Sequence, residues 1–437
     1  MARPALKLVT LAAATALVVL AAGPATATRP VPAATGNPLQ PGARLFVDPH
    51  STTVDAMHHL TGAARADAQV LAGFPSATWF TSGTARAVQN DAAKVVREAR
   101  KDGSMPVLVA YFLPNRDCGQ YSAGGAQSTA QYEAWIDGLA AGIDEAPAAV
   151  ILEPDGLGLI PNYVSKIDGS SNCTITGADP ADRFTQLGYA VDTLKAHAAT
   201  SVYLDATHTG WQNVGESAQR LLMAGVQRAD GFFLNASNYQ LTPNLVDYGR
   251  WVSSCIALAE RDSAADPTAY DFGGQCGNQY WNGGPATGWS GDTMDNAQAW
   301  SNAPYSGNPV DLKWNTVGID SRYASQLGST QPTTHFVLDT SRNGRGPWTG
   351  GTQYPDRQDW CNPPGRGLGL APTTTTGNPL VDAYLWIKVP GESDGQCNRG
   401  TGGTTDPEWG GITDPVAGAW FPAQAHQLIE LADPPLA

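Results

Sequence analysis

Basic side chains are scarce in this sequence, which has 26 Lys and Arg residues against 40 Asp and Glu. Proteins that bind nucleic acids or anionic membranes present clustered Lys and Arg, so we expect neither kind of partner. Charged residues of both signs make up only 15% of the 437 residues, whereas Gly, Asn, Thr and Trp are frequent. This composition favours a ligand that is neutral and polar.

The sequence also lacks the patterns that hold metal ions. It contains no CxxC pair, and His58-His59 stands without further ligands at a useful spacing. We therefore expect neither a metal nor another cofactor. An even number of cysteines in an exported chain predicts disulfides, and six are present: Cys118, Cys173, Cys255, Cys276, Cys361 and Cys397. Their pairing is open at this point, and joining neighbours in order (118–173, 255–276, 361–397) would close three long loops.

A long apolar run occurs only near the start of the chain. Arg3 and Lys7 precede a run of Leu, Val and Ala, and Ala25-Thr26-Ala27 has the form of a cleavage site. Residues 1–27 therefore read as a secretory signal peptide, and we expect a secreted, extracellular protein. Its removal would leave a formal charge of 24 − 40 = −16. Residues 28–43 form a short Pro/Thr/Gly-rich tail, and residues 44–437 are expected to form one domain.

Within this domain, strand-like and helical segments alternate. The strand-like segments are 44–47, 77–80, 105–112, 149–153, 201–206, 231–235, 335–340 and 383–389, and amphipathic stretches between them include 85–100, 129–143, 184–198 and 214–224. This alternation predicts a parallel sheet and, at seven or eight units, a barrel. Residues 260–330 and 391–422 instead read as long Gly-rich loops, which are usually functional in a compact domain.

The segment AVILEPD (149–155) is the most informative. Four apolar residues predict a strand buried on both faces, and Pro154 ends it because proline has no N–H to donate. Glu153 and Asp155 thus lie at the carboxyl end of a core strand, where α/β barrels place their chemistry. Acids at strand ends are also common as solvated groups, so this segment alone does not show whether Glu153 and Asp155 are functional.

Other strands end in acids as well. Asp117, Asp205 and Asp339 follow three of them, and Glu392 and Asp394 follow the last. Carboxylates crowded at one face of a barrel cannot all stay ionised, so at least one pKa must rise. A protonated acid beside an ionised one is what glycosidic cleavage requires. Tryptophans near these ends would suit sugar-ring stacking, although any one of them could be core: Trp79, Trp211, Trp281, Trp289, Trp348, Trp360 and Trp386.

At these residues the chain resembles glycoside hydrolase family 6, the inverting cellulases. Its two diagnostic motifs correspond to VAYFLPNRDCGQYSAGG (109–125) and VILEPDGLG (150–158). Further similar blocks follow in the family's order: YLDATHTGW (203–211), LNASNYQ (234–240), DTSRNG (339–344), WCNPPGRGLG (360–369) and LWIKVPGESDG (385–395). The resemblance implies a distorted α/β barrel of seven parallel strands, a monomer, and cellulose or another β-1,4-glucan as substrate.

The resemblance also implies roles for individual residues. Asp155 corresponds to the general acid, Asp117 to the residue that raises its pKa, and Asp394 to an often-proposed base, although water activation through a chain is also argued for the family. The positions that match substrate-binding residues are Tyr111, Ser122, Asp205, His208, Trp211, Asn235, Trp360, Lys388 and Glu392, and Arg342 lies in a matching block. Ser122 is the candidate for a water-holding serine, at a register uncertain by one residue.

Two modes of action exist within this resemblance. Family endoglucanases have short loops and an open cleft, whereas loops as long as 260–330 and 391–422 would roof the active site into a tunnel. We therefore expect an exo-type 1,4-β-cellobiohydrolase, like those of actinobacteria, that attacks non-reducing chain ends. An endoglucanase is the alternative, and a non-catalytic glucan-binding protein is a third reading, disfavoured by the intact set Asp117, Asp155 and Asp394.

Overall fold

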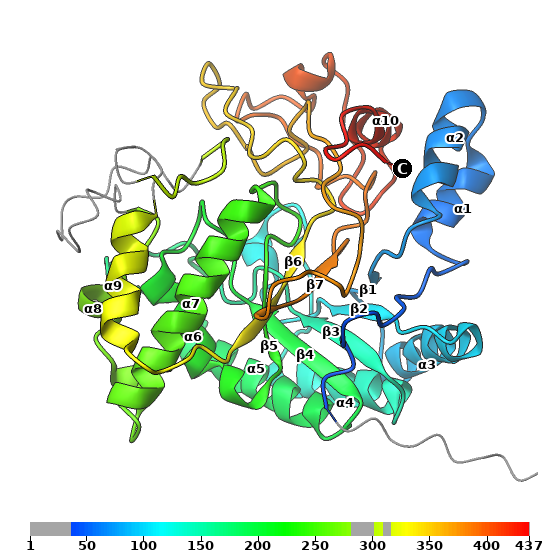
Figure 1. The fold of residues 1–437 in the computed structure, drawn as a ribbon. Coiled ribbons are helices and arrows are strands. Elements are labelled where there is room, and N and C mark those ends of the chain that lie inside the picture. The colour runs from blue at the N-terminus through cyan, green and yellow to red at the C-terminus, as the bar shows by residue number, and fades with distance from the viewer. Residues whose placement is uncertain (1–35, 281–300, 309–315, 437) are drawn as a thin grey trace, which may run out of the picture. The chain divides into compact units, whose positions relative to one another are not determined.

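Seven parallel strands form one curled sheet in the order β1 to β7 (Figure 1). In this computed structural model, residues 36–280, 301–308 and 316–436 are described. The strands are β1 (Thr78–Phe80), β2 (Val107–Ala110), β3 (Ala148–Leu152), β4 (Thr200–Asp205), β5 (Gly231–Leu234), β6 (His335–Asp339) and β7 (Val381–Leu385). Each pairs in parallel with the next along the chain. The predicted seven-stranded parallel barrel variant is confirmed.

The helices cover the outer face of the sheet and its ends. They are α1 (Thr52–His59), α2 (Gly62–Leu71), α3 (Ala85–Asp102), α4 (Thr129–Ile143), α5 (Pro180–Lys195), α6 (Val214–Met223), α7 (Thr242–Asp262), α8 (Phe272–Gln275), α9 (Val317–Leu327) and α10 (Pro422–Glu430). In α3, Thr84 caps the first turn by accepting from the Ala87 amide, and Gly103, with φ of 67°, ends the helix. Val88, Ala92, Val96 and Ala99 lie on its buried face, at the spacing that an amphipathic helix requires.

Alternate strand residues divide the core into two parts. Val109, Ile151, Tyr203 and Phe233 point into the barrel and belong to an interior cluster, whereas neighbouring residues such as Val150 pack against the helices in a larger outer cluster. This alternation follows from the two-residue period of a strand. Because both faces are buried, the strands read as continuous apolar runs in the sequence.

The amino-terminal segment seals one end of the barrel. Leu39 and Leu45 are buried in the interior cluster, and Asn37 Nδ2 donates to Tyr203 Oη (2.7 Å) and to Asp382 Oδ2 (2.8 Å). Residues 44–47 were expected to form a strand, but only an isolated bridge, Leu45 to Met105, is present. The segment lies across the end of the sheet and therefore pairs with one residue just before β2 rather than forming a full ladder.

β1 and β7 do not form a ladder, so the barrel has a seam. Two hydrogen bonds cross it just beyond β7. The Ala77 amide donates to the Trp386 carbonyl (2.9 Å), and Trp79 Nε1 donates to the Ile387 carbonyl (2.7 Å). The seam is thus closed by single bonds rather than by strand pairing.

Three disulfides join all six cysteines, and of the pairings left open by the sequence the structure has neighbours in chain order: Cys118–Cys173, Cys255–Cys276 and Cys361–Cys397. The expected loop 260–330 contains two helices, α8 and α9. Trp281 and Trp289, expected to approach the sugar, lie outside the described residues, as does the expected signal peptide. Among the described residues, no helix is both long and apolar enough to cross a lipid bilayer.

Candidate active site

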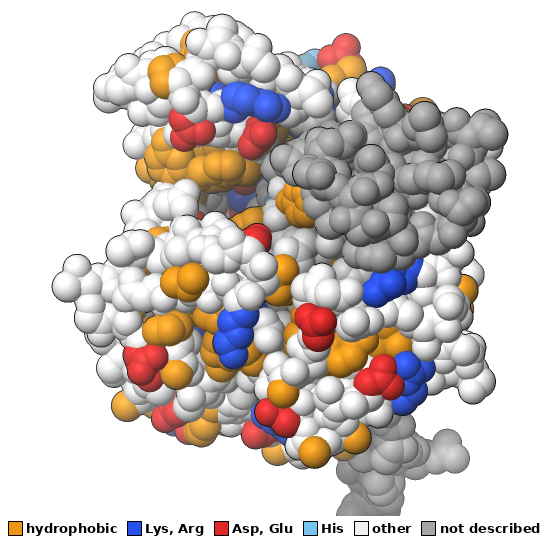
Figure 2. Space-filling model, turned by 90° about the vertical axis from the view of Figure 1, so that its left-hand side faces the viewer, with side chains coloured by type: hydrophobic (Ala, Val, Ile, Leu, Met, Phe, Trp, Pro, Cys, Tyr) orange, Lys and Arg blue, Asp and Glu red, His pale blue; other side chains and the backbone are white. Residues whose placement is uncertain are grey.

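A cleft of about 600 Å³ lies at the carboxyl ends of the strands. The space-filling view shows the molecule deeply hollowed, with hydrophobic and charged side chains inside the hollow (Figure 2). Ten of the twelve predicted site residues line the cleft: Tyr111, Asp117, Ser122, Asp155, His208, Trp211, Trp360, Lys388, Glu392 and Asp394. The strand ends therefore converge on one cavity, as a parallel barrel requires.

The end of β3 makes a tight turn that presents Asp155 to the cleft. Glu153 and Asp155 have φ of 58° and 62°, a left-handed conformation that is uncommon for residues other than glycine. The Glu153 carboxylate turns away from the cleft and accepts from the amides of Phe112 (2.9 Å) and Leu113 (3.1 Å). The two acids of the EPD motif thus have different tasks, since Glu153 holds the backbone and Asp155 faces the cavity.

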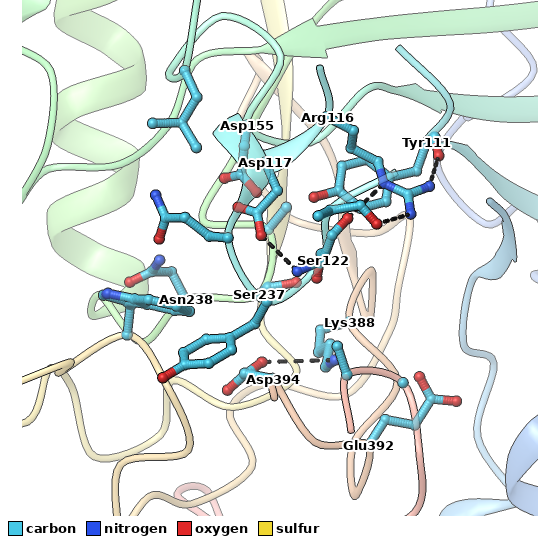
Figure 3. Close-up of a pocket in the computed structure, with 18 of the residues that line it drawn as sticks. Tyr111, Arg116, Asp117, Ser122, Asp155, Ser237, Asn238, Lys388, Glu392 and Asp394 are labelled. Carbon is cyan, nitrogen blue, oxygen red and sulfur yellow. Dashed lines mark hydrogen bonds and ion pairs between the residues drawn. The ribbon is translucent and has the colours of Figure 1, made fainter. Parts of the chain in front are cut away.

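Asp117 follows β2 in a loop that Arg116 braces. Arg116 donates to the carbonyls of Thr81, Tyr111 and Ser122 at 2.7–2.8 Å. The Ser122 amide donates to Asp117 Oδ2 (2.7 Å). Asp117 and Asp155 lie on the same side of the pocket, with Asp394 and Lys388 across from them (Figure 3).

Burial dominates the ionisation of this group. It raises the pKa of Asp155 well above its ordinary value, and the charges of Asp117, Asp205 and Asp394 raise it further. Burial also raises the pKa of Asp117 to about 6, against the lowering effect of the Ser122 amide, and raises that of Asp205 to about 6. Asp155 is therefore the carboxyl group of the cleft that best retains its proton near neutral pH.

Asp394 has the opposite character. Although burial opposes ionisation, Arg342 and Lys388 hold the pKa of Asp394 below its ordinary value. Arg342 makes two hydrogen bonds of 2.9 Å to its carboxylate, and Tyr239 Oη donates a third, also of 2.9 Å. Arg342, placed by sequence among binding blocks, is fully buried and acts on Asp394 instead.

Lys388 and Glu392 form one end of the cleft. Lys388 Nζ donates to the Ser393 carbonyl (3.0 Å) and lies 3.6 Å from Asp394. Glu392 accepts a hydrogen bond from the hydroxyl of Thr52 at the start of α1, and burial raises its pKa. The amino-terminal helix thus holds a residue that lines the cleft.

Aromatic side chains line the rest of the cavity. Trp79, Trp211 and Trp360 face it, whereas Trp348 and Trp386 are buried in the protein. Trp211 lies directly over the turn after Asp155, because a Cβ at Gly158 would stand 2.4 Å from its ring. His208, next to Trp211, accepts from the Gly210 amide through Nδ1 (3.1 Å); burial lowers its pKa to about 3, so the ring is neutral.

Two predicted substrate-binding residues do not line the cleft. Asp205 accepts from the amides of Thr207 (2.9 Å) and Leu157 (3.3 Å), and Asn235 is fully buried and donates to the Asp339 carbonyl (2.9 Å). Both side chains support the backbone behind the site. Other lining residues had no signal beyond their place in the motifs: Arg116, Tyr121, Ser237 and Asn238. Asp359, just before the block 360–369, had none.

One group of described residues has the spacing of metal ligands, namely Cys397, Asp406 and Asp414. Cys397 is in a disulfide, and Asp406 already forms an ion pair of 2.6 Å with Arg399. The cation of this cluster is therefore a guanidinium, and its residues do not line the cleft.

Comparison with known proteins decides the family. The sequence matches Glycosyl hydrolases family 6 over residues 40–432. The chain belongs to this family. It is 32% identical over 402 residues to endoglucanase 1 of Streptomyces halstedii, covering 91% of this chain and 92% of that protein. It is 31% identical over 370 residues to endoglucanase A of Thermobispora bispora, covering 84% of this chain and 57% of the relative, so the chain spans little more than half of that protein's length.

Other family 6 members carry a different activity in their names. The chain is 29% identical over 429 residues to the probable 1,4-beta-D-glucan cellobiohydrolase C of Aspergillus fumigatus, covering 91% of this chain and 78% of that one.

Among solved structures, the endoglucanase Cel6 of Mycobacterium tuberculosis in complex with methyl-cellobiosyl-4-deoxy-4-thio-beta-D-cellobioside aligns with a TM-score of 0.60 at 30% identity. It covers 90% of this chain and 98% of its own.

Proposed function

We propose that this family 6 protein hydrolyses β-1,4-glucosidic bonds of cellulose with inversion at the anomeric carbon. The observation that carries the proposal is the pairing of Asp155, whose pKa is raised well above its ordinary value, with Asp394, whose pKa is lowered, in one tryptophan-lined cleft. A protonated and an ionised carboxyl flanking the scissile bond are the groups that glycoside hydrolysis uses.

In this mechanism Asp155 protonates the leaving oxygen and a water attacks from the opposite face of the sugar. The low pKa of Asp394 and the four hydrogen bonds that its carboxylate accepts from Arg342, Tyr239 and the Asn362 amide make it a weak proton acceptor. We therefore assign to Asp394 the stabilisation of positive charge that develops on the sugar. The proton of the attacking water leaves through a chain of waters, with Asp117 and Ser122 as its protein partners.

We further propose exo action, with cellobiose released from non-reducing chain ends. The loops after β2, β6 and β7 support it, because the β2 loop touches the other two beside the cleft. Tyr121 packs its Cβ against Gly395, its ring lies 5.7 Å from Trp360, and its hydroxyl accepts from Gln358 Nε2 (3.2 Å). Such contacts enclose a glucan and favour threading of a free end.

Endoglucanase activity is the second candidate. It is favoured by the names of the Streptomyces, Thermobispora and Mycobacterium relatives, which at 30–32% identity are all endoglucanases. The two modes differ in how fast they shorten a soluble polymer. An enzyme that threads chain ends should lower the viscosity of carboxymethylcellulose little per bond cut, and cellobiose should dominate its early products from amorphous cellulose.

If the viscosity falls as fast per reducing end formed as it does with an endoglucanase, this protein is an endoglucanase instead. Inversion is tested separately by NMR of fresh product, where α-cellobiose should appear first; β-anomer first would overturn it. We also propose that the protein is secreted, since its six cysteines all form disulfides, which persist in oxidising compartments.

A further inference from the structure

The loops that carry Asp117 and Asp155 come from different strands, yet one buried side chain touches both. Arg183, on α5, donates from Nη2 to the Pro114 carbonyl (3.0 Å), three residues before Asp117. Its Nη1 donates to the Gly156 carbonyl (2.7 Å), directly after Asp155, and reaches the Leu159 carbonyl at 3.4 Å. The side chain is only 4% exposed and does not line the active-site cleft.

The β3 turn needs external support of this kind. Glu153 and Asp155 both have left-handed φ, and such conformations cost on the order of 1–3 kcal/mol each unless the surroundings over-determine them. Within the turn, the Gly156 amide donates to the Glu153 carbonyl and the Leu159 amide to the Asp155 carbonyl, both at 2.8 Å. These bonds fix the turn internally but leave its placement against the β2 loop open.

Two buried groups set that placement. The Glu153 carboxylate binds the amides of Phe112 and Leu113, and the Arg183 guanidinium binds the carbonyl of Pro114, the residue that follows them. Burial raises the pKa of Glu153 to about 7 and lowers that of Arg183 to about 10, and the attraction between the two groups opposes both shifts. A carboxyl group and a guanidinium thus hold donors and acceptors of the same loop.

We propose that Arg183 is a positioning residue that sets the distance between Asp117 and Asp155 by binding the backbone of both loops. Lysine cannot replace it fully, because an ammonium lacks the planar fork that reaches two directions at once. The proposal rests on the proposed function, in which Asp155 is the acid and the charge of Asp117 keeps it protonated. The pKa of Asp155 also depends on Asp205, Asp394 and Tyr111. None of these three takes part in the hydrogen bonds of Arg183 described above.

The test compares Arg183→Met and Arg183→Lys with a matched control, Gln186→Met. Gln186 lies one turn further along α5, is 4% exposed, and donates to Thr129 Oγ1 (2.8 Å) on α4 rather than to the backbone of either loop. All three variants lose a buried hydrogen bond and should unfold at lower temperature. Only the Arg183 variants should change the chemistry.

For Arg183→Met we expect kcat on cello-oligosaccharides to fall about 10- to 100-fold, as small misplacements of catalytic groups do, with KM little changed. The alkaline limb of the pH profile should move to lower pH, because a displaced Asp117 no longer raises the pKa of Asp155. A cellobioside with a very good leaving group should lose much less. Arg183→Lys should show a smaller change in the same directions.

If Arg183→Met fails to fold, the comparison of Arg183→Lys with Gln186→Met tests the proposal. The positioning role would be overturned if the Arg183 variant and Gln186→Met had the same alkaline limb and the same ratio of rates on the activated cellobioside and on cello-oligosaccharides. Asp155→Asn, measured in parallel, separates this from failure of the proposed function. Full activity of Asp155→Asn on cellulose would show that Asp155 is not the general acid, and the proposed function would fail. An inactive Asp155→Asn beside an unaffected Arg183 variant would refute only the inference about Arg183.

Discussion

Asp155 is the only residue of the EPD motif whose carboxylate faces the cleft, so its loss should be chemical rather than structural. We predict that Asp155→Asn folds normally and loses about 10²- to 10⁴-fold of its activity on cellulose, the usual share of general acid catalysis. A cellobioside with a very good leaving group needs less protonation and should be hydrolysed nearly as fast as by the unchanged protein. Initial rates on both substrates, with circular dichroism for folding, measure this. Equal losses on both would contradict an acid role.

Asp117 should act on the same proton through its charge. Asp155 must be protonated to work, so activity is lost as the pH rises through its pKa, and the negative charge of Asp117 raises that pKa. Asp117→Asn removes the charge, and we therefore predict that the alkaline limb of kcat/KM moves to lower pH. A complete pH profile on a soluble cello-oligosaccharide records the shift. A limb that stays in place would show that Asp117 serves another purpose.

At the level of single residues, Asp117, Asp155 and Asp394 lie in one cleft, as the sequence predicts, but two of the predicted binding residues do not line it. The EPD and RDC motifs put Asp155 and Asp117 at strand ends, and strand direction alone brings them to one face. Asp205 and Asn235 stand at similar strand ends, yet Asp205 binds the Thr207 amide of its own loop and Asn235 binds the Asp339 carbonyl at the end of β6. Whether an acid faces the cavity or the backbone depends on the local φ and on unpaired amides nearby, which a sequence pattern does not encode.

Among the elements, the loop after β7 contains a pair of acids that should make its stability depend on pH. The carboxylate oxygens of Asp406 and Asp414 lie within 4.8 Å of each other, and burial with this neighbour raises the pKa of Asp414 to about 7. Because the folded state holds this proton more tightly than the unfolded chain, the stabilisation is complete below about pH 4 and is lost as the pH rises through about 7.

Asp414→Asn should reduce this dependence. The amide oxygen can keep the bond from Asn362 Nδ2 (2.8 Å), and its NH₂ group would face the Asp406 carboxylate. We predict that the melting temperature of the variant falls less than that of the unchanged protein between mildly acidic and mildly alkaline buffers. Differential scanning calorimetry across that range tests it, with Asp91→Asn on the exposed face of α3 as the control. A parallel fall in both proteins would refute the assignment.

The elements themselves were largely predictable. Residues 129–143 were predicted as a helix and α4 has these bounds, because its apolar residues recur at helical spacing. Seven apolar runs became β1 to β7, but residues 44–47 did not pair as a strand, since a run of apolar residues does not reveal whether a neighbouring edge is free. The sequence predicts a long irregular loop over 260–330, whereas α8 and α9 lie in it, because its many Gly and Asn residues obscure short helices.

At the scale of the whole molecule, the barrel is least stabilised at the seam between β1 and β7, where single hydrogen bonds replace strand pairing. Trp79 crosses it with one hydrogen bond and also faces the cleft. Trp79→Phe keeps an aromatic ring but removes the indole N–H, and one hydrogen bond contributes about 0.5–1.5 kcal/mol. We predict a melting temperature lower by a few degrees with only a small rise in KM. A large loss of affinity at unchanged stability would mean that the indole acts on substrate rather than on the seam.

The segment that seals the barrel has a consequence for how the chain is made. Asn37 lies near the start of the domain and is therefore synthesised early, yet one of its partners, Asp382, is 345 positions later. Its other partner, Tyr203, itself donates to Asp382 (2.6 Å). Until β7 has been synthesised, Leu39 and Leu45 have no finished interior to enter. The first part of the domain must therefore wait for the last, and contacts so distant in sequence form slowly. Nascent chains halted before β7 should remain protease-sensitive along their whole length, and only complete chains should acquire resistance.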